Sequence, residues 1–302
     1  NKNILRRIRK MGKKISQYNE LAHLTDGGGD FLPITGADGT TYKIDGAHLG
    51  DGARSASAIR FNNRVDRNWD GLGSLVANAT DVTADFDSGV LSTKIAANDF
   101  NDYDLGMKIK KTISIGGTNY TAHIIFAHAN AFYGYSSYAM VDTPNIGCVV
   151  YVEGYTSTWN ASNTDGGYTS SVLRTSIQNV VNAVKTAIGA THMISHQVLL
   201  SSAVSGGKSS SWAWQSSSYG EALSAAQMCG TEISGSFYDT GEAYEQLALF
   251  RHVRANQAFG SLNVWLRDVL AASLAARLDG LGSLDDYSVT ASHFVVPLIL
   301  LK

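Results

Sequence analysis

Apolar residues recur every three or four positions through residues 169–189, TSSVLRTSIQNVVNAVKTAIG. This spacing places them in a single stripe along one face of an α-helix: Val172, Leu173, Ile177, Val180, Val181, Val184 and Ile188. Thr169 or Ser170 is expected to cap the start of this helix, and Gly189 its end. We also expect a second helix over residues 195–204, which stops at a following Gly-Gly pair.

Shorter segments have the alternating or continuous apolar pattern of β-strands. Residues 108–115 and 118–125 flank a Gly-Gly turn and predict a hairpin with alternating faces. Residues 148–153 form a further apolar strand. The Ser-Trp-Ala-Trp run at 211–214 predicts a strand or turn, and residues 220–230 contain a short helix.

The N-terminal part of the chain is dominated by turn residues. Short apolar pieces at 31–34 and 41–44 fit a small hairpin. Residues 61–88 are irregular and polar and are left unassigned. No internal repeat is evident. Two helices inserted among strands and Gly-rich loops predict an α+β fold rather than a βαβ array.

Residues 265–269, Trp-Leu-Arg-Asp-Val, have the strict composition of a core strand. Alternation would point Trp265, Arg267 and Val269 to one face of the strand, and Leu266 and Asp268 to the other. Because buried charges need partners, Arg267 and Asp268 next to core aromatics predict a structural scaffold. Residues 270–294 are a less regular mixture of small, polar and apolar residues. This composition predicts side chains that can vary without disturbing the core strand at 265–269.

Composition narrows the class of protein. The 302 residues are 44% hydrophobic and 17% charged and include 30 Gly, which suits one or two loop-rich domains with a sizeable core. No apolar run reaches the roughly 18–20 residues that a membrane span needs. Two cysteines are too few for a disulfide framework, so synthesis in the cytoplasm is expected.

Charge is unevenly distributed along the chain. Residues 2–14 carry seven cations and no acid, so the net charge of −2 leaves −9 for all other residues (−2 − 7 = −9). Apolar residues interleave with these cations at nearly helical spacing, so the segment could bind nucleic acid, a membrane surface or an acidic protein face, or be a solvated leader. The acidic remainder argues against a nucleic-acid-binding protein.

Candidate catalytic or metal-binding groups are sparse. His192 and His196 are four residues apart, but they lack the Glu of H-E-x-x-H, and structural roles are favoured over a shared metal. Three further pairs of candidates lie near turns or strand ends: His123 with His128, Asp102 with Asp104, and Asp285 with Asp286. Neither a G-x-S-x-G elbow nor a phosphate-binding loop is present, so we expect no enzyme, no cofactor and no metal.

Four segments, in order, resemble a domain family common in bacterial prophages: TDGGYTSSVLRT at 164–175, HMISHQVLLSSAVSGGKSSSWAW at 192–214, YDTGEAYEQLALFR at 238–251 and VWLRDV at 264–269. The resemblance covers residues 89–302 and implies a C-type-lectin-like fold of the formylglycine-generating-enzyme branch. That branch includes the variable proteins of diversity-generating retroelements. The chain departs from the family's final Gly-Val-Arg-Pro, having Phe-Val-Val-Pro at 294–297, and has no Cys after residue 230 for oxidase chemistry.

The segment KISQYNELAHLTDGGGDFLPITGADGTTYKID is similar to the opening of phage tail and head fibre proteins. Together the two resemblances imply three regions. Residues 1–20 would be a basic amphipathic leader, 21–88 a small β-rich, partly extended attachment region, and 89–302 a lectin-like ligand-binding domain of short strands with two inserted helices.

These resemblances imply a virion protein of a bacteriophage, expected as a homotrimer, that attaches to other phage structural proteins through its N-terminal region. Its variable C-terminal face would bind a host-surface protein or glycan without chemistry, nucleic acid or membrane insertion. The alternatives are a structural decoration or neck protein of the particle, and an oxidase-like or glycan-hydrolysing enzyme. Expected ligand contacts are Ser261, Asn263, Ser273, Arg277, Asp285, Asp286, Tyr287, Thr290, Ser292 and His293.

Overall fold

The computed structural model describes residues 31–35, 41–45, 55–133, 141–206, 208–230 and 246–302. The chain divides into two compact units, Asn1–Ala56 and Ser57–Lys302. In the first unit, β1 (Phe31–Thr35) and β2 (Thr41–Asp45) pair antiparallel, which confirms the hairpin predicted there. The basic segment at 2–14 lies outside the described residues.

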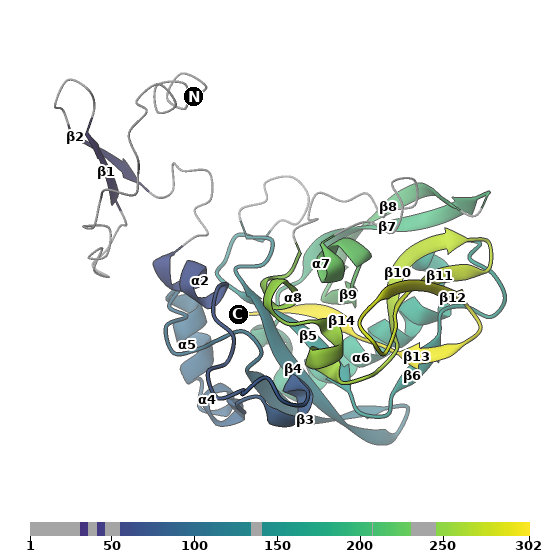
Figure 1. Cartoon of the computed structure of the whole chain (residues 1–302), viewed down its shortest axis with the longest axis horizontal. Helices are drawn as coiled ribbons and strands as arrows, with labels where there is room; N and C mark the ends of the chain where they lie inside the picture. Colours follow the sequence, from purple (N-terminus) through teal and green to yellow (C-terminus); the bar gives the residue numbers. More distant parts are fainter. Residues whose placement is uncertain (1–30, 36–40, 46–54, 134–140, 207, 231–245) are drawn as a thin grey trace. The chain divides into compact units, whose positions relative to one another are not determined.

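Two five-stranded sheets and a long hairpin form the second unit (Figure 1). The first sheet contains, in spatial order, β3 (Lys108–Ile115), β4 (Thr118–Ala129), β5 (Ile146–Val152), β14 (Pro297–Leu301) and β9 (Gly220–Ala222). The second sheet contains β12 (Leu284–Ser288), β11 (Leu274–Leu278), β10 (Val264–Ala271), β13 (Ser292–Phe294) and β6 (Thr156–Thr158). The hairpin is β7 (His196–Ser205) with β8 (Lys208–Ser218). The fold class is therefore α+β, as predicted.

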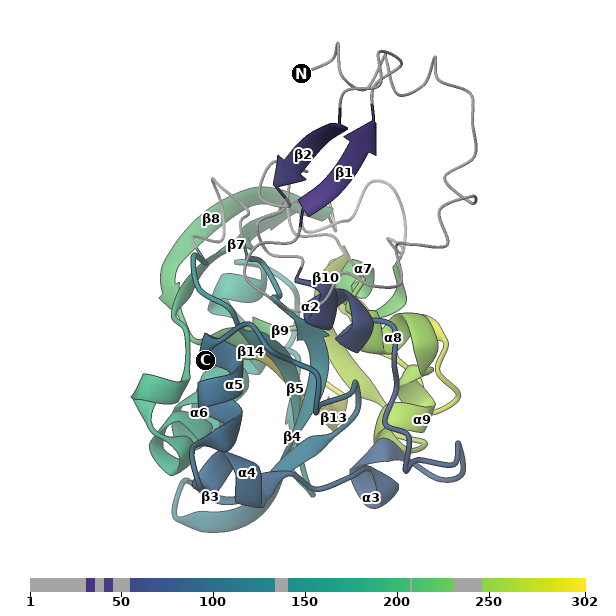
Figure 2. The ribbon, with the colours of Figure 1, turned by 90° about the vertical axis from the view of Figure 1, so that its left-hand side faces the viewer.

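One long helix and several short ones surround the sheets. The long helix is α6 (Val172–Ile188), which packs against β3, β9 and β14. The short helices are α2 (Ala56–Phe61), α3 (Leu75–Asn78), α4 (Thr83–Asp87), α5 (Val90–Ala96), α7 (Ala225–Cys229), α8 (Ala248–His252) and α9 (Ala255–Phe259). Figure 2 shows α6 on one side of β4 and β5, with α8 and α9 on the other. In the described ranges, no helix has the length and apolar character needed to cross a membrane.

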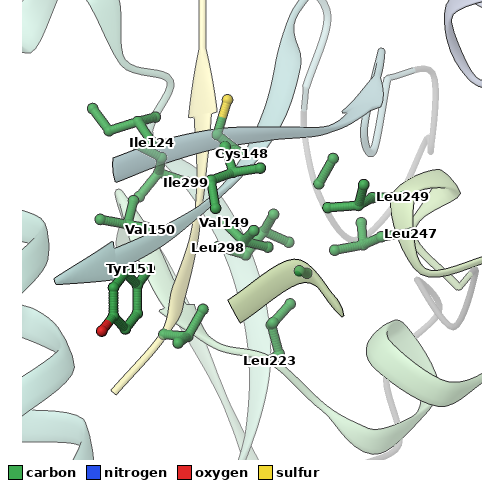
Figure 3. Close-up of a cluster of buried hydrophobic side chains, with 14 of the residues drawn as sticks. Ile124, Cys148, Val149, Val150, Tyr151, Leu223, Leu247, Leu249, Leu298 and Ile299 are labelled. Carbon is green, nitrogen blue, oxygen red and sulfur yellow. The ribbon is translucent and has the colours of Figure 1, made fainter. Parts of the chain in front are cut away.

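The core is a continuous cluster that joins the first sheet to α6. Ile109, Ile124 and Val150 lie in cross-strand register on β3, β4 and β5, and each is 0% exposed. The apolar stripe predicted for α6 is buried with them, except Val172, which is 39% exposed. Figure 3 shows part of this cluster, including Cys148 and the β14 residue Ile299. Both cysteines are free, and burial raises the pKa of the Cys148 thiol.

The sequence prediction for residues 195–204 is wrong, because this segment is strand β7 and not a helix. A short apolar run fits either state, and here the register with β8 decides it, pairing Leu199 with Trp214 and Leu200 with Ala213. The strand alternative for 211–214 is confirmed by β8, and the short helix within 220–230 is confirmed by α7.

The start of α6 lies slightly later than expected. Thr169 and Ser170 belong to a 3₁₀ turn, and Ser171 is the N-cap, its Oγ accepting the backbone N–H of Arg174 at 3.0 Å. The predicted end at Gly189 is confirmed. A single residue of displacement in the cap is within the usual ambiguity of helix ends when several Ser and Thr residues are adjacent.

Residues 57–88, which the sequence analysis assigns to the attachment region, pack with the second unit. Helices α2, α3 and α4 bury Phe61, Leu75 and Phe86 in the same core as the strands. Asp104 is 0% exposed in its side chain and forms ion pairs with Arg64 and with Arg67, the latter at 3.4 Å. The compact unit therefore starts at Ser57 and not at residue 89.

Candidate binding surface on the C-terminal sheet

Three neighbouring strands of the second sheet place side chains in one cross-strand row. Trp265 of β10 pairs with Arg277 of β11, and Arg277 pairs with Asp285 of β12. Residues directly opposite each other in an antiparallel sheet share a face, and the residue two positions further along a strand returns to that face. Tyr287 therefore joins the same face as Asp285.

Arg277 is the centre of this group of side chains. Its Nη2 donates to Asp285 Oδ2 at 3.1 Å, and its Cζ lies 3.7 Å from the centroid of the Tyr287 ring. Its Nη1 lies 3.4 Å from Nε2 of His293, which is therefore the acceptor. The guanidinium is thus held by an ion pair, a cation–π contact and an imidazole at the same time.

His293 connects this group to the core. Its ring lies 4.5 Å from that of Trp265 and 5.2 Å from that of Tyr287. Burial, followed by the charge of Arg277, lowers the pKa of His293 to about 4. The imidazole is therefore neutral at pH 7, as an acceptor from Arg277 must be.

The group has a buried floor and an exposed top. Trp265 is 0% exposed and donates its Nε1–H to the Ser157 carbonyl of β6 at 3.0 Å, whereas Tyr287 is 42% exposed. The Asp285 side chain is 44% exposed, against 13% for Arg277. An oriented tyrosine ring and a carboxylate, fixed by an arginine beneath them, form a surface suited to non-covalent recognition. We call Arg277, Asp285, Tyr287 and His293 the arginine cluster.

The other predicted contacts lie elsewhere on the sheet. Ser261 and Asn263 precede β10, where Asn263 Oδ1 accepts the N–H of Gly280 in the β11–β12 turn. Ser273 follows β10 at its opposite end, where its carbonyl accepts the N–H of Val289. Thr290 is near that end too, and its Oγ1 lies 3.0 Å from the Oγ of Ser288.

Two further predicted contacts lie on strands β12 and β13. Asp286 is exposed, adjacent to Asp285 on β12, and donates its N–H to Asp285 Oδ1 at 2.8 Å. Ser292 is exposed and donates to the Oγ1 of Thr156 on β6 at 2.9 Å. The structure therefore brings together four of the ten predicted contacts, and the other six surround them at the ends and edges of the sheet.

Arg267 and Asp268 are 6% and 7% exposed and interact with the chain between β9 and α7. The Arg267 N–H donates to the Leu223 carbonyl, and Asp268 Oδ2 accepts the N–H of Ala225 at 2.7 Å. The pairing of β10 with β11 is irregular between Trp265 and Val269, where the register shifts. The Arg267 N–H, which lies in this irregular stretch, bonds outside its own sheet.

The histidine and carboxylate pairs have separate structural partners. The imidazole of His192 bonds to the Ser92 hydroxyl, while His196 is buried at the start of β7. His123 Nε2 pairs with Glu153 Oε1 at 2.7 Å, and burial lowers its pKa. Throughout the described ranges, no group of three or more His, Cys, Asp or Glu side chains could hold a metal ion.

Strand β6 is a part of this surface that the sequence does not predict. Its residues Thr156 and Ser157 bond to β13 and to Trp265, so β6 forms the sheet edge beside the arginine cluster. The available signal was a Thr-Ser-Thr run before Trp159, which is too short to predict a strand.

Comparisons of the chain with protein-family models, with curated proteins and with solved structures find no match.

Proposed function

We propose that the chain is a bacteriophage virion protein of the fibre type, which binds a ligand on the host surface through its C-terminal sheet. Binding is non-covalent, the N-terminal unit attaches the protein to other phage structural proteins, and the assembled form is a homotrimer. The second unit is, on this proposal, a C-type-lectin-like domain related to the variable proteins of diversity-generating retroelements. The protein is not an enzyme and works on the virion.

The observation that carries this proposal is the arginine cluster on its buried frame. Trp265 and the bonds of Arg267 and Asp268 hold β10 in place, while Tyr287 and Asp285 face solvent. A rigid base lowers the entropic cost of ordering the contact residues upon binding. The exposed positions of β12 can change without loss of core packing, as a diversified binding surface requires.

Binding of the labelled full chain to a panel of bacterial cells tests this proposal. Tyr287→Ala should lower cell binding by about tenfold or more, because an exposed aromatic anchor is removed. Tyr219→Ala is the matched control, since the Tyr219 ring also carries a cation, Lys185 Nζ at 4.5 Å, but lies between β8 and β9. It should bind as the unaltered chain does.

Three results would argue against the proposal. Cell binding that is the same in Tyr287→Ala as in the unaltered chain would remove the arginine cluster from the binding surface. Binding to phage particles alone, with no cell in the panel bound, would favour the alternative of a decoration or neck protein. Turnover of a host glycan during incubation would contradict binding without chemistry.

A further inference from the structure

The sequence contains one short repeat, contrary to the expectation of no internal repeat. The hexapeptide Asp-Gly-Leu-Gly-Ser-Leu occurs at residues 70–75 and again at 279–284. The first copy leads into α3, and the second forms the turn between β11 and β12. The central leucines, Leu72 and Leu281, are 70% and 78% exposed, the highest values for large apolar side chains in the described part of the chain.

The two turns satisfy the backbone of the exposed leucine in the same way. Asp70 Oδ1 accepts the N–H of Leu72 at 2.8 Å, and Asn78 Nδ2 donates to the Leu72 carbonyl at 2.9 Å. In the second turn, the corresponding acceptor is Asp279 Oδ1, at 2.9 Å from the N–H of Leu281.

The Leu281 carbonyl receives an equivalent bond from a different element. Asn256 of α9 donates its Nδ2–H to this carbonyl at 3.0 Å. The side-chain amides of Asn78, close to the first turn, and of Asn256, in α9, thus each donate to the carbonyl of an exposed leucine. Each leucine tip can therefore lose its water without leaving the N–H or C=O of that leucine unpaired.

The fold brings the two turns to the same part of the second unit. Helix α9 contacts α3, and a Cβ placed on Gly260 would lie 3.9 Å from the Cβ of Ser74 in the first turn. A Cβ on Gly280 in the second turn would lie 3.0 Å from the carbonyl oxygen of Ser261. Both turns thus touch the adjacent residues Gly260 and Ser261, and Figure 2 shows α3 and α9 as neighbours.

The chemistry of the two turns, residues 70–75 and 279–284, distinguishes a protein partner from a lipid surface. Two leucines, each flanked in its turn by Gly, Ser and Asp, offer far less apolar surface than the roughly 800 Å² per partner of a stable protein interface. Lipid, in contrast, supplies no hydrogen bonds to the peptide groups that enter it, so such groups must be paired internally.

We propose that Leu72 and Leu281 insert together into the surface of a zwitterionic, phosphatidylcholine-type lipid layer. The carboxylates of Asp70 and Asp279 then lie at headgroup depth, where the choline ammonium is their counter-charge. Contact is shallow and reversible, as expected for two inserted side chains. This inference differs from the expectation of no membrane insertion, and it is independent of the ligand of the arginine cluster.

Flotation of the full chain with phosphatidylcholine vesicles tests this inference. These vesicles have no net charge, so the cationic segment at 2–14 has no surface charge to bind. The unaltered chain should float with the vesicles, and the partition coefficient should fall about tenfold in Leu72→Ser or Leu281→Ser and about a hundredfold in the double variant. Because both side chains are exposed, all variants should unfold at the temperature of the unaltered chain.

Val90→Ser is the matched control, since Val90 is an apolar residue that is 46% exposed on α5. It should float as the unaltered chain does. Absence of flotation, or equal flotation of the double variant, would overturn the inference. So would a dimer, seen by sedimentation velocity, that the double variant dissociates, because the leucines would then contact a second copy.

Discussion

His196 and His293 are neutral imidazoles in the folded protein because burial disfavours their charged form. Burial is the main cause that lowers the pKa of each to about 4, and a nearby arginine adds to it, Arg267 for His196 and Arg277 for His293. In the unfolded chain the imidazole has a pKa near 6.5. Protonation between these values therefore favours the unfolded state.

The free energy of unfolding should fall as the pH is lowered from 6.5 to 4. In this window the unfolded chain binds a proton at His196 and the folded chain does not, so stability is complete above pH 6.5 and is lost below it. For His196 the loss is on the order of 3 kcal/mol at pH 4. Denaturant titrations at several pH values measure it.

His196→Phe provides the control for this assignment. It removes the titrating group next to the ring of Phe132, 5.7 Å away, so the slope of stability against pH should decrease by about one proton in the same window. Measurement at pH 8 gives the effect of the substitution on packing alone. An unchanged slope would show that the pKa of His196 does not differ between the folded and the unfolded chain.

At the residue scale, sequence reasoning identified residue types better than their contacts. Arg277, Asp285, Tyr287 and His293 were predicted as separate contacts, and their mutual arrangement depends on the register of β10 to β13. A strand register is set by turns and packing, which a list of polar residues does not contain. The repeat at 70–75 and 279–284 can be read from the sequence. That its two copies lie near each other depends on the contacts of both turns with α9 and the residues that follow it.

At the element scale, a substitution at the N-cap of α6 tests how much the cap contributes to the stability of the protein. Ser171→Ala should lower the free energy of unfolding by about 1 kcal/mol, because Ser171 Oγ accepts the N–H of Arg174 and no other group replaces it. Thermal or chemical denaturation measures the loss. Ser170→Ala is the matched control, since Ser170 is exposed and lies before the cap. An equal loss in both variants would contradict the assignment of the cap.

Elements with a long, regular pattern were predicted well, and short ones were not. The stripe of α6 and the hairpin of β3 and β4 each have enough residues to distinguish a helical from an alternating period. Strand β7 was predicted as a helix because its run of Val, Leu, Ser and Ala fits both periods. Its pairing with β8, the next strand along the chain, decides the state, and the apolar run of β7 alone does not contain this contact.

At the scale of the whole molecule, the boundary of the second unit can be tested by truncation. A fragment of residues 57–302 should unfold cooperatively, whereas 89–302 should be unfolded or strongly destabilised. The shorter fragment lacks Phe61 and Leu75, and it leaves the buried Asp104 without Arg64 and Arg67. An unpartnered buried charge alone costs about 3–5 kcal/mol.

Circular dichroism and calorimetry of the two fragments distinguish these outcomes. The full chain is the control, and 57–302 should match its transition temperature if the first unit contributes little. A cooperative transition for 89–302 at the same temperature would show that the boundary expected from the sequence is sufficient. Loss of structure in 57–302 would instead show that the second unit needs residues from the first.

The sequence by itself determined the α+β class, the helix α6, the hairpin at the start of the first sheet and the strand around Trp265. These follow from periodicity over many residues, which depends on local geometry alone. Only the tertiary structure decided that residues 57–88 belong to the core, that β7 is a strand, and that the arginine cluster and the two leucine turns form. Each of these depends on contacts that a segment makes outside itself, with a neighbouring strand or with residues far apart in the chain, and a local pattern does not contain the energies of these contacts.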